Sequence, residues 1–290
     1  MRWCLWLLAP VLGFSQLRID HVSIAGGNLD HMRERLGRAG LQAEYGGRHA
    51  NGTTEMALVS FPDGSYLELI APVKGADTTS LAAHPWARLL QGEGQPAAWA
   101  MRARDFDGEV SRLRAAGIPV QPQLRTGRQR PDGVSLEWQT ATIGTGADAL
   151  LFPFLIQDFT PRARRAEPSG HPTTKAFEGI HYVVIAVKNL DEGIERYRKA
   201  FGSPPPIKQI AREWGAQLAL LGNLPVILAA PVTADSLLNE RLSRFGEGPV
   251  GVLLKVRNKP AHRAMPSTRW FGEDVFWLDA PALGWQLGYQ

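Results

Sequence analysis

The sequence predicts an α+β protein built from short strands and helices that repeat along the chain. Residues 20–30 and 181–191 are related in sequence, which indicates a repeated unit. The 30 glycines and 21 prolines among 290 residues favour many turns and short strands over a helical bundle. With 44% apolar and 21% charged residues, the chain is long enough and apolar enough to bury a sizeable core.

The charge and cysteine content exclude several classes of protein. Lys and Arg number 32 against 28 Asp and Glu, which gives a formal net charge of +4. This excess is too small to indicate nucleic-acid binding, so we expect no nucleic-acid partner. The single cysteine, Cys4, excludes a disulfide framework and a zinc site built on cysteines.

Residues 1–15 resemble a bacterial secretory signal peptide. The basic residue Arg2 precedes an apolar run from Trp3 to Phe14. This run is too short to cross a bilayer as a helix, which takes about 20 residues. We therefore expect an exported protein, periplasmic or extracellular, with no stable membrane anchor once the segment is removed. A buried N-terminal strand or helix is the alternative.

The repeated unit begins with a strand followed by a helix. The segments DHVSIAGGNLD and HYVVIAVKNLD are identical at six of eleven positions. In both, β-branched residues predict a strand, and Asn28 or Asn189 then caps a helix next to an acidic residue. Each predicted helix ends at a glycine, Gly40 or Gly202.

Antiparallel strands are expected after each helix. Further copies of the unit start near residues 97, 179 and 250, so four units form two pairs. Between the pairs lies a segment rich in Pro, Arg and Ser, which indicates a linker whose arginines at 162, 164 and 165 are solvated. The expected organisation is a signal peptide at 1–15, domains at 17–160 and 177–290, and a linker at 161–176.

Four groups of residues carry a resemblance to a known family: Ile19-Asp20-His21-Val22, Gly46-Gly47-Arg48-His49 followed by Gly52-Thr53, Asp63-Gly64-Ser65-Tyr66-Leu67-Glu68-Leu69-Ile70-Ala71-Pro72, and Arg130-Pro131-Asp132-Gly133 leading to Trp138. Together they resemble the vicinal oxygen chelate superfamily, and within it the glyoxalase-like domain group. The likeness is good over residues 17–160 and thinner over 177–290. It implies paired βαβββ modules that build a curved sheet around a cleft, in two tandem domains.

The resemblance also implies a divalent metal ion in the N-terminal cleft, because metal-binding members take one ligand from the first and one from the last strand of each module. The matching positions are His21 and Glu68 in the first module, and Ala98 and Gln157 in the second. Imidazole and carboxylate suit Zn, Ni, Fe or Mn. Ala98 cannot coordinate and Gln157 is an uncharged ligand, so the implied site is His21, Glu68 and, weakly, Gln157.

Other residues are candidates for catalysis and substrate binding. A glyoxalase I-type isomerisation needs a carboxylate base, and Gln157 does not titrate, so Glu55 is the candidate base if its side chain points inward. Glycine-rich loops, guanidinium groups and tryptophans commonly hold oxygen-bearing ligands. The candidate substrate-binding residues on these grounds are His49, Arg128, Arg130 and Trp138. A plain structural or solvent-exposed role is the alternative for each.

Two functions from different classes are open on this basis. One is a metal-dependent lyase, isomerase or dioxygenase whose metal acts as a Lewis acid on a small oxygen-rich molecule. The other is a metal-free protein that binds or sequesters a small molecule in the same cleft. A scaffold for a partner, or a homodimer, also stays open. The C-terminal half is expected to be a degenerate copy, because Tyr182, Ile227 and Gly251 occupy its ligand positions.

Overall fold

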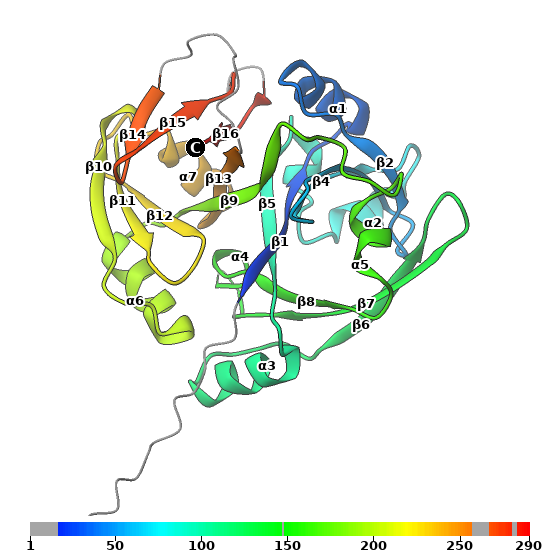
Figure 1. Ribbon diagram of the computed structural model, residues 1–290, viewed down its shortest axis with the longest axis horizontal. Coiled ribbons are helices and arrows are strands. Elements are labelled where there is room, and N and C mark those ends of the chain that lie inside the picture. The colour runs from blue at the N-terminus through cyan, green and yellow to red at the C-terminus, as the bar shows by residue number, and fades with distance from the viewer. Residues whose placement is uncertain (1–16, 147, 257–266, 280–282) are drawn as a thin grey trace, which may run out of the picture.

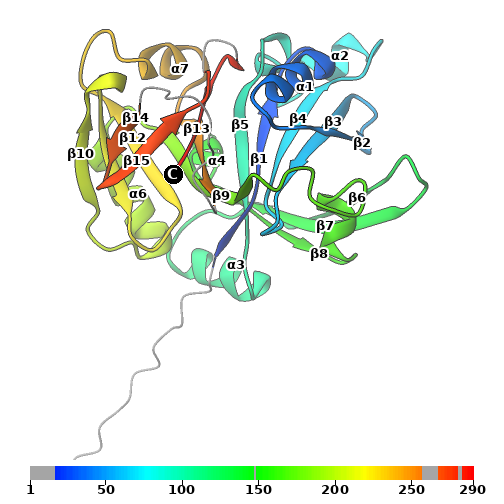
Figure 2. The ribbon, with the colours of Figure 1, turned by 45° about the horizontal axis from the view of Figure 1, so that its top comes forward.

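The computed structural model describes residues 17–146, 148–256, 267–279 and 283–290, so the expected signal peptide lies outside the described residues. The chain forms two eight-stranded mixed sheets that stand side by side, each curved around its own interior (Figures 1 and 2). This confirms the predicted α+β class of paired modules in tandem. Within the described part of the chain, no helix is long and apolar enough to span a membrane.

The first sheet has the strand order β2-β3-β4-β1-β5-β8-β7-β6. Its strands are β1 (Arg18–Ala25), β2 (Glu44–Arg48), β3 (Thr54–Ser60), β4 (Tyr66–Pro72), β5 (Gln95–Arg102), β6 (Leu124–Gln129), β7 (Ser135–Thr142) and β8 (Phe154–Asp158). Its helices are α1 (Leu29–Arg38), α2 (Thr78–Ala82), α3 (Phe106–Ala115) and α4 (Asp148–Leu151), with a 3-10 turn, η1 (Leu89–Gln91). The linker contains α5 (Arg162–Ala166).

The second sheet repeats this order as β10-β11-β12-β9-β13-β16-β15-β14. Its strands are β9 (Phe177–Ala186), β10 (Ile207–Ala211), β11 (Ala216–Leu221), β12 (Val226–Pro231), β13 (Gly248–Val256), β14 (Ser267–Trp270), β15 (Glu273–Trp277) and β16 (Gln286–Tyr289). Its helices are α6 (Leu190–Phe201) and α7 (Leu238–Phe245), with a 3-10 turn, η2 (Arg212–Trp214).

Local sequence signals explain where the helices begin and end. The side chains of Asn28, Asp105 and Asn189 accept backbone N–H groups in the first turns of α1, α3 and α6. Helix α6 stops at Gly202, which adopts the left-handed conformation that favours glycine. Each of these helices buries one apolar stripe against its sheet.

One apolar core joins the two halves of the molecule. It contains buried side chains from the outer faces of both sheets, among them Val22 and Trp99 of the first and Val183 and Ile185 of the second. Strands β5 and β13 contact each other at this junction, and so do β1 and β9. The two sheets are therefore packed back to back, and their interiors face away from each other.

The edge strands of each sheet approach one another, so that each sheet nearly closes into a barrel. In the first, Arg128 Nη1 on β6 donates to the Gly46 carbonyl on β2 at 2.5 Å. In the second, the amide of Gln209 on β10 donates to the Arg269 carbonyl and accepts from the Phe271 N–H, both at 2.6 Å. We call these structures the N-terminal and the C-terminal barrel.

Candidate functional site

A cleft of about 680 Å³ occupies the interior of the N-terminal barrel. Most of its wall is apolar, and its apolar residues include Met56, Leu58, Ile70, Trp86, Trp138, Phe154 and Ile156. The polar and charged side chains on the wall include His21, Ser23, His49, Glu68, Arg128 and Arg165. A large apolar cavity with a few grouped polar side chains is the usual form of a small-molecule site.

Glu68 on β4 stands between two imidazoles on the wall of this cleft. Its Oε2 atom lies 3.6 Å from His21 Nε2, and its Oε1 atom lies 3.6 Å from His49 Nε2. Ser23 donates its hydroxyl to Oε2 at 3.1 Å. The structure therefore brings together three residues that the sequence singled out, His21, His49 and Glu68, and adds Ser23 from the neighbouring strand.

The Glu68 carboxylate is held in its ionised form. Burial by itself would raise its pKa, but His49, His21 and the Ser23 hydroxyl favour the charged form, outweigh burial and lower the pKa to about 2. Only 13% of the side chain is exposed, so these neighbours act with little solvent screening. The group is thus a negatively charged acceptor at neutral pH.

His21 is fixed by contacts on every side. Its Nδ1 atom lies 2.7 Å from Asp20 Oδ1, its ring stacks on Tyr66 at 4.7 Å, and the Phe154 edge approaches at 5.4 Å. Asp20 reaches the ring of its own neighbour because the pairing of β1 with β5 shifts register between Ile19 and His21. Such a bulge redirects a side chain that would otherwise point to the opposite face.

Arginines from the linker complete the site, contrary to the expected solvated linker. Arg165 is 4% exposed and pairs with Asp20 at 3.1 Å and with Asp158 at 2.5 Å, while Arg162 donates to Asp20 at 2.9 Å. Burial alone would raise the pKa of Asp20, but Arg165, His21 and Arg162 hold that pKa well below its ordinary value. Arg164, between them on α5, is exposed as predicted.

Asp20, Arg162 and Arg165 were not among the candidate residues. Arg165 donates to Asp20, 145 positions away in the sequence, and no local sequence pattern predicts such a contact. The one available signal was that arginines recur at 162 and 165, three positions apart and therefore on one face of a helix.

Two of the predicted site residues lie away from the cleft. Gln157 accepts a hydrogen bond at 2.7 Å from Gln139 on the neighbouring strand, while Phe154 and Ile156 of the same strand line the cleft. Strand alternation therefore points Gln157 to the outer face. Glu55 likewise lies on the outer face of β3, where Tyr45 donates to it at 3.0 Å. Neither side chain reaches the site, so Glu55 is not placed to act there as a base.

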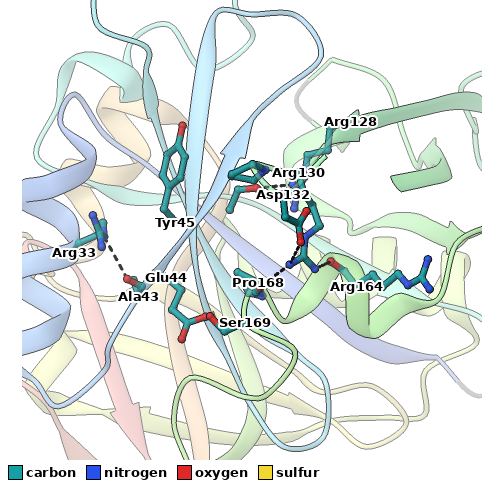
Figure 3. Close-up of a pocket in the computed structure, with 12 residues that line it drawn as sticks. Arg33, Ala43, Glu44, Tyr45, Arg128, Arg130, Asp132, Arg164, Pro168 and Ser169 are labelled. Carbon is teal, nitrogen blue, oxygen red and sulfur yellow. Dashed lines mark hydrogen bonds and ion pairs between the residues drawn. The ribbon is translucent and has the colours of Figure 1, made fainter. Parts of the chain in front are cut away.

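The two predicted arginines occupy different places. Arg128 lines the cleft and also a second pocket of about 400 Å³ outside the barrel, between β2 and the linker (Figure 3). Arg130 lines only this outer pocket, where it pairs with Asp132 at 2.9 Å and donates to the Arg164 carbonyl at 2.9 Å. Trp138 is on the cleft wall, where the sequence placed it.

The residues present do not fit the four-ligand metal site that the family resemblance implies. In the first module Ser23 pairs with Glu68, and in the second module the related residue Ala100 pairs with Phe154. The residue related to Glu68, which is the fourth ligand position, is therefore Phe154 and not Gln157. Ala98 and Phe154 supply no ligand atom. Across the described ranges, no three His, Cys, Asp or Glu side chains meet in an arrangement that could hold a metal ion.

The interior of the C-terminal barrel is filled with apolar side chains. Trp214, Trp270 and Trp277 pack against one another with ring centroids 4.9 to 5.2 Å apart. Ile227, at the position related to Glu68, is fully buried in the same cluster. A side chain added at Gly251, which matches Ala98, would start 3.3 Å from the Trp214 ring.

Comparisons with known proteins agree with this fold. The glyoxalase-like domain family matches residues 19–183. No curated protein matches the chain. A hypothetical protein from Staphylococcus aureus is similar over 94% of this chain and 99% of its own, at 15% identity and a TM-score of 0.65.

Two enzymes of known structure are similar over part of their fold. A mutant of 4-hydroxymandelate synthase from Streptomyces coelicolor matches 84% of this chain and 72% of its own, at 15% identity and a TM-score of 0.55. Methylmalonyl-CoA epimerase from Mycobacterium tuberculosis matches 40% of this chain and 89% of its own, at 21% identity and a TM-score of 0.36. The chain belongs to the glyoxalase-like domain family.

Proposed function

We propose that the N-terminal barrel binds a small, mostly apolar molecule whose polar group lies against His21, His49 and Glu68. The observation that carries this proposal is an ionised carboxylate between two imidazoles on the wall of a largely apolar cleft of about 680 Å³. The apolar wall would supply most of the binding free energy, and the polar group would set the orientation of the ligand.

The lining refines the ligand class expected from the sequence. An oxygen-rich molecule would need polar partners along its whole length, because each polar group buried without a partner costs binding energy. In this cleft apolar side chains such as Met56, Leu58 and Ile70 make up most of the exposed wall. The ligand that fits best is therefore apolar along most of its length.

A divalent-metal enzyme is the rival function. His21 and Glu68 are ligand types for Zn, Ni, Fe or Mn, and a bound ion would supply Lewis-acid chemistry there. With alanine and phenylalanine at the two remaining ligand positions, the donor set favours metal-free binding. Elemental analysis of the purified protein and of His21→Ala separates the two functions. A transition metal at full occupancy that is lost in His21→Ala would support the enzyme.

Binding can be tested with 2-naphthol, a small aromatic probe with one hydroxyl group, by isothermal titration calorimetry. Thr140→Trp places a bulky side chain on the cleft wall and should weaken binding by about tenfold or more. Gln139→Trp is the matched control, because Gln139 precedes Thr140 on β7 and points to the outer face. Equal binding by both variants, or no binding by the wild type, would contradict the proposal.

We further propose that the protein is exported, on the basis of residues 1–15 alone. Expression of the full chain in a bacterium, followed by cell fractionation and N-terminal sequencing, tests this. Export predicts a product in the periplasm or the medium that begins near Gln16.

A further inference from the structure

We propose that the cleft of the N-terminal barrel takes an apolar carboxylic acid, whose carboxylate pairs with the Nε and Nη2 atoms of Arg128. This inference rests on the proposed function and deepens it. It assigns a chemical class to the ligand and makes Arg128 a second polar point on the cleft wall, apart from His21, His49 and Glu68.

The side chain of Arg128 starts on the inner face of the barrel. Leu124, Thr126 and Arg128 occupy alternate positions of β6, and all three line the cleft. Thr126 stands opposite Trp138 of β7, which also lines the cleft, and the next inward pair along the two strands is Arg128 with Leu136. Arg128 is only 8% exposed. Its guanidinium group is therefore a buried cation at the cleft wall.

Most of this guanidinium group is free of protein partners. Its Nη1 atom donates to the Gly46 carbonyl at 2.5 Å, which joins β6 to β2. Within the part of the chain that the structure describes, Nε and Nη2 of Arg128 have no hydrogen-bond partner, and no carboxylate lies within 4.0 Å of the group. Neither nitrogen is fully buried. A ligand can therefore reach both of them.

Arg165, which also lines the cleft, shows what these two atoms are suited to bind. Its Nε and Nη2 atoms donate to the two carboxylate oxygens of Asp158, at 2.5 and 2.9 Å. Its other N–H groups donate to Asp20 and Tyr66, so Arg165 offers no free donor to a ligand. Two parallel N–H groups match the two oxygens of a carboxylate. Among the described residues, the same pair of atoms in Arg128 has no acid to bind, and a ligand carboxylate fits it.

Burial of the Arg128 cation has a cost that its protein neighbours offset only in part. The pKa of Arg128 is lowered because burial disfavours the charged form, and the nearby Glu68, which acts in the opposite direction, does not restore it. Buried charges in proteins are usually paired with an opposite charge. A ligand carboxylate would supply an ion pair and two hydrogen bonds, which are strong where water is excluded.

A carboxylate fits this wall better than other charged groups. Arg128 would repel an ammonium group. A phosphate has more charge and more oxygens than two N–H groups can satisfy, and most of the surrounding wall is apolar. The apolar body of the acid would lie on side chains such as Met56, Leu58 and Trp138.

Two probes that differ in charge test the ligand class. 2-Naphthoate and 2-naphthamide have the same rings and nearly the same shape, but only 2-naphthoate is an anion at neutral pH. Calorimetry on the wild type should show at least about tenfold tighter binding of 2-naphthoate. Equal or tighter binding of the amide, or no binding of 2-naphthoate, would overturn this inference. Binding of 2-naphthol would in that case leave the proposed function intact.

Replacing Arg128 should remove the preference for the acid. Arg128→Gln loses the charge but keeps an amide that can donate to Gly46, so the preference for 2-naphthoate over 2-naphthamide should fall by about tenfold, to parity or below. Arg128→Lys keeps the charge without the parallel N–H groups and should retain part of the preference. Arg125→Gln is the matched control, because Arg125 is an exposed residue of the same strand that pairs with Glu137. An unchanged preference in Arg128→Gln, or an equal loss in Arg125→Gln, would contradict the inference.

Arg128 also lines the outer pocket, so further variants test where the acid binds. Thr140→Trp narrows the cleft and should weaken 2-naphthoate binding by about tenfold or more, whereas Gln139→Trp should not. Arg130→Gln alters only the outer pocket and should leave the affinity unchanged. Weaker binding in Arg130→Gln together with unchanged binding in Thr140→Trp would place the acid in the outer pocket and overturn the inference.

Discussion

The two barrels share one topology and one strand order but differ in what fills them. In the N-terminal barrel, the side chains that point inward leave a cleft and place an ionised carboxylate on its wall. In the C-terminal barrel, three tryptophans and their apolar neighbours occupy the corresponding space. The fold therefore provides the enclosure, and a few inward positions decide whether it binds a ligand or forms a second core.

The register of the central strands identifies those positions. Ser23 stands opposite Glu68 in the first sheet, and Val184 stands opposite Ile227 in the second. Counted from these pairs, Tyr182 corresponds to His21. The indole N–H groups of Trp270 and Trp277 donate to Glu213 and Thr268, at 2.7 and 3.0 Å. Among the residues that the structure describes, the inward side chains of the C-terminal barrel thus form a second apolar core.

The largest change in stability is expected when Ile227 and Glu68, which occupy related positions in the two barrels, are each replaced by the other residue type. Ile227→Glu puts a carboxylate among tryptophans without a cationic partner, so we expect a loss of at least about 3 kcal/mol in the free energy of unfolding. Glu68→Ile should cost less, on the order of 2 kcal/mol, because the cleft wall accommodates an apolar side chain although the neighbours of Glu68 lose their carboxylate partner, and it should weaken 2-naphthol binding. Urea denaturation measures both. Similar losses in the two variants would mean that the barrels do not differ as described.

The next largest loss of stability is expected when Arg165 of the linker is replaced by alanine. Arg165→Ala leaves Asp20 buried with only Arg162 as a cationic partner, and Asp158 loses its bidentate partner. We expect a loss of roughly 3 kcal/mol in unfolding free energy. Arg164→Ala should stay within about 0.5 kcal/mol, because Arg164 is exposed. A mild Arg165→Ala variant would argue against a buried ion network under the cleft.

Acid should destabilise the protein through the N-terminal barrel. The pKa of Glu68 is lowered to about 2 in the folded protein, from 4.5 ordinarily, so its stabilising interactions are fully present above about pH 5 and are lost as the pH falls toward 2. The loss should be on the order of 2 to 3 kcal/mol, and Asp20, whose pKa is also lowered, adds to it in the same direction. Unfolding curves between pH 6 and about pH 2.5 measure the change. Glu68→Gln should reduce this pH dependence; an equally steep dependence would show that other groups cause it.

The smallest change in stability is expected at His49. Its ring is partly exposed, so His49→Ala should alter the unfolding free energy by about 1 kcal/mol or less. Affinity for 2-naphthol should nevertheless fall a few-fold, since Glu68 loses one of its two imidazole neighbours. His181→Ala is the control, because His181 lies on β9 of the other barrel and does not line the cleft, and it should leave probe binding unchanged. A loss of binding in both variants would indicate a general effect on the fold.

Local sequence patterns accounted for the fold and for the core of the site. The repeat at residues 20–30 and 181–191, the helix caps at Asn28 and Asn189, and the motif around Glu68 predicted the elements and their order. His21, His49 and Glu68 could be singled out because each belongs to a motif of the family. Tyr182, Ile227 and Gly251 at the ligand positions also predicted that the C-terminal copy would lack a polar site.

The wrong predictions concern residues whose orientation, into the cleft or away from it, depends on strand register. Gln157 and Phe154 are three residues apart on one strand, so a small error in alignment assigns the inward position to the wrong side chain. Glu55 was the candidate base only if its side chain pointed inward, and the structure places that side chain on the outer face of β3. The linker arginines were interpreted as solvated because charged segments rich in Pro and Ser usually are.

The sequence by itself determined the repeated units, the class of fold and the two ligand-type residues His21 and Glu68, because these depend on periodicity and on neighbouring residues. Only the tertiary structure decided which side chains meet. It brought Arg165 to Asp20 over 145 positions of sequence, aimed Asp20 at His21 through a bulge, and filled one barrel with tryptophan while leaving the other open. Those outcomes depend on long-range packing, which no short segment encodes.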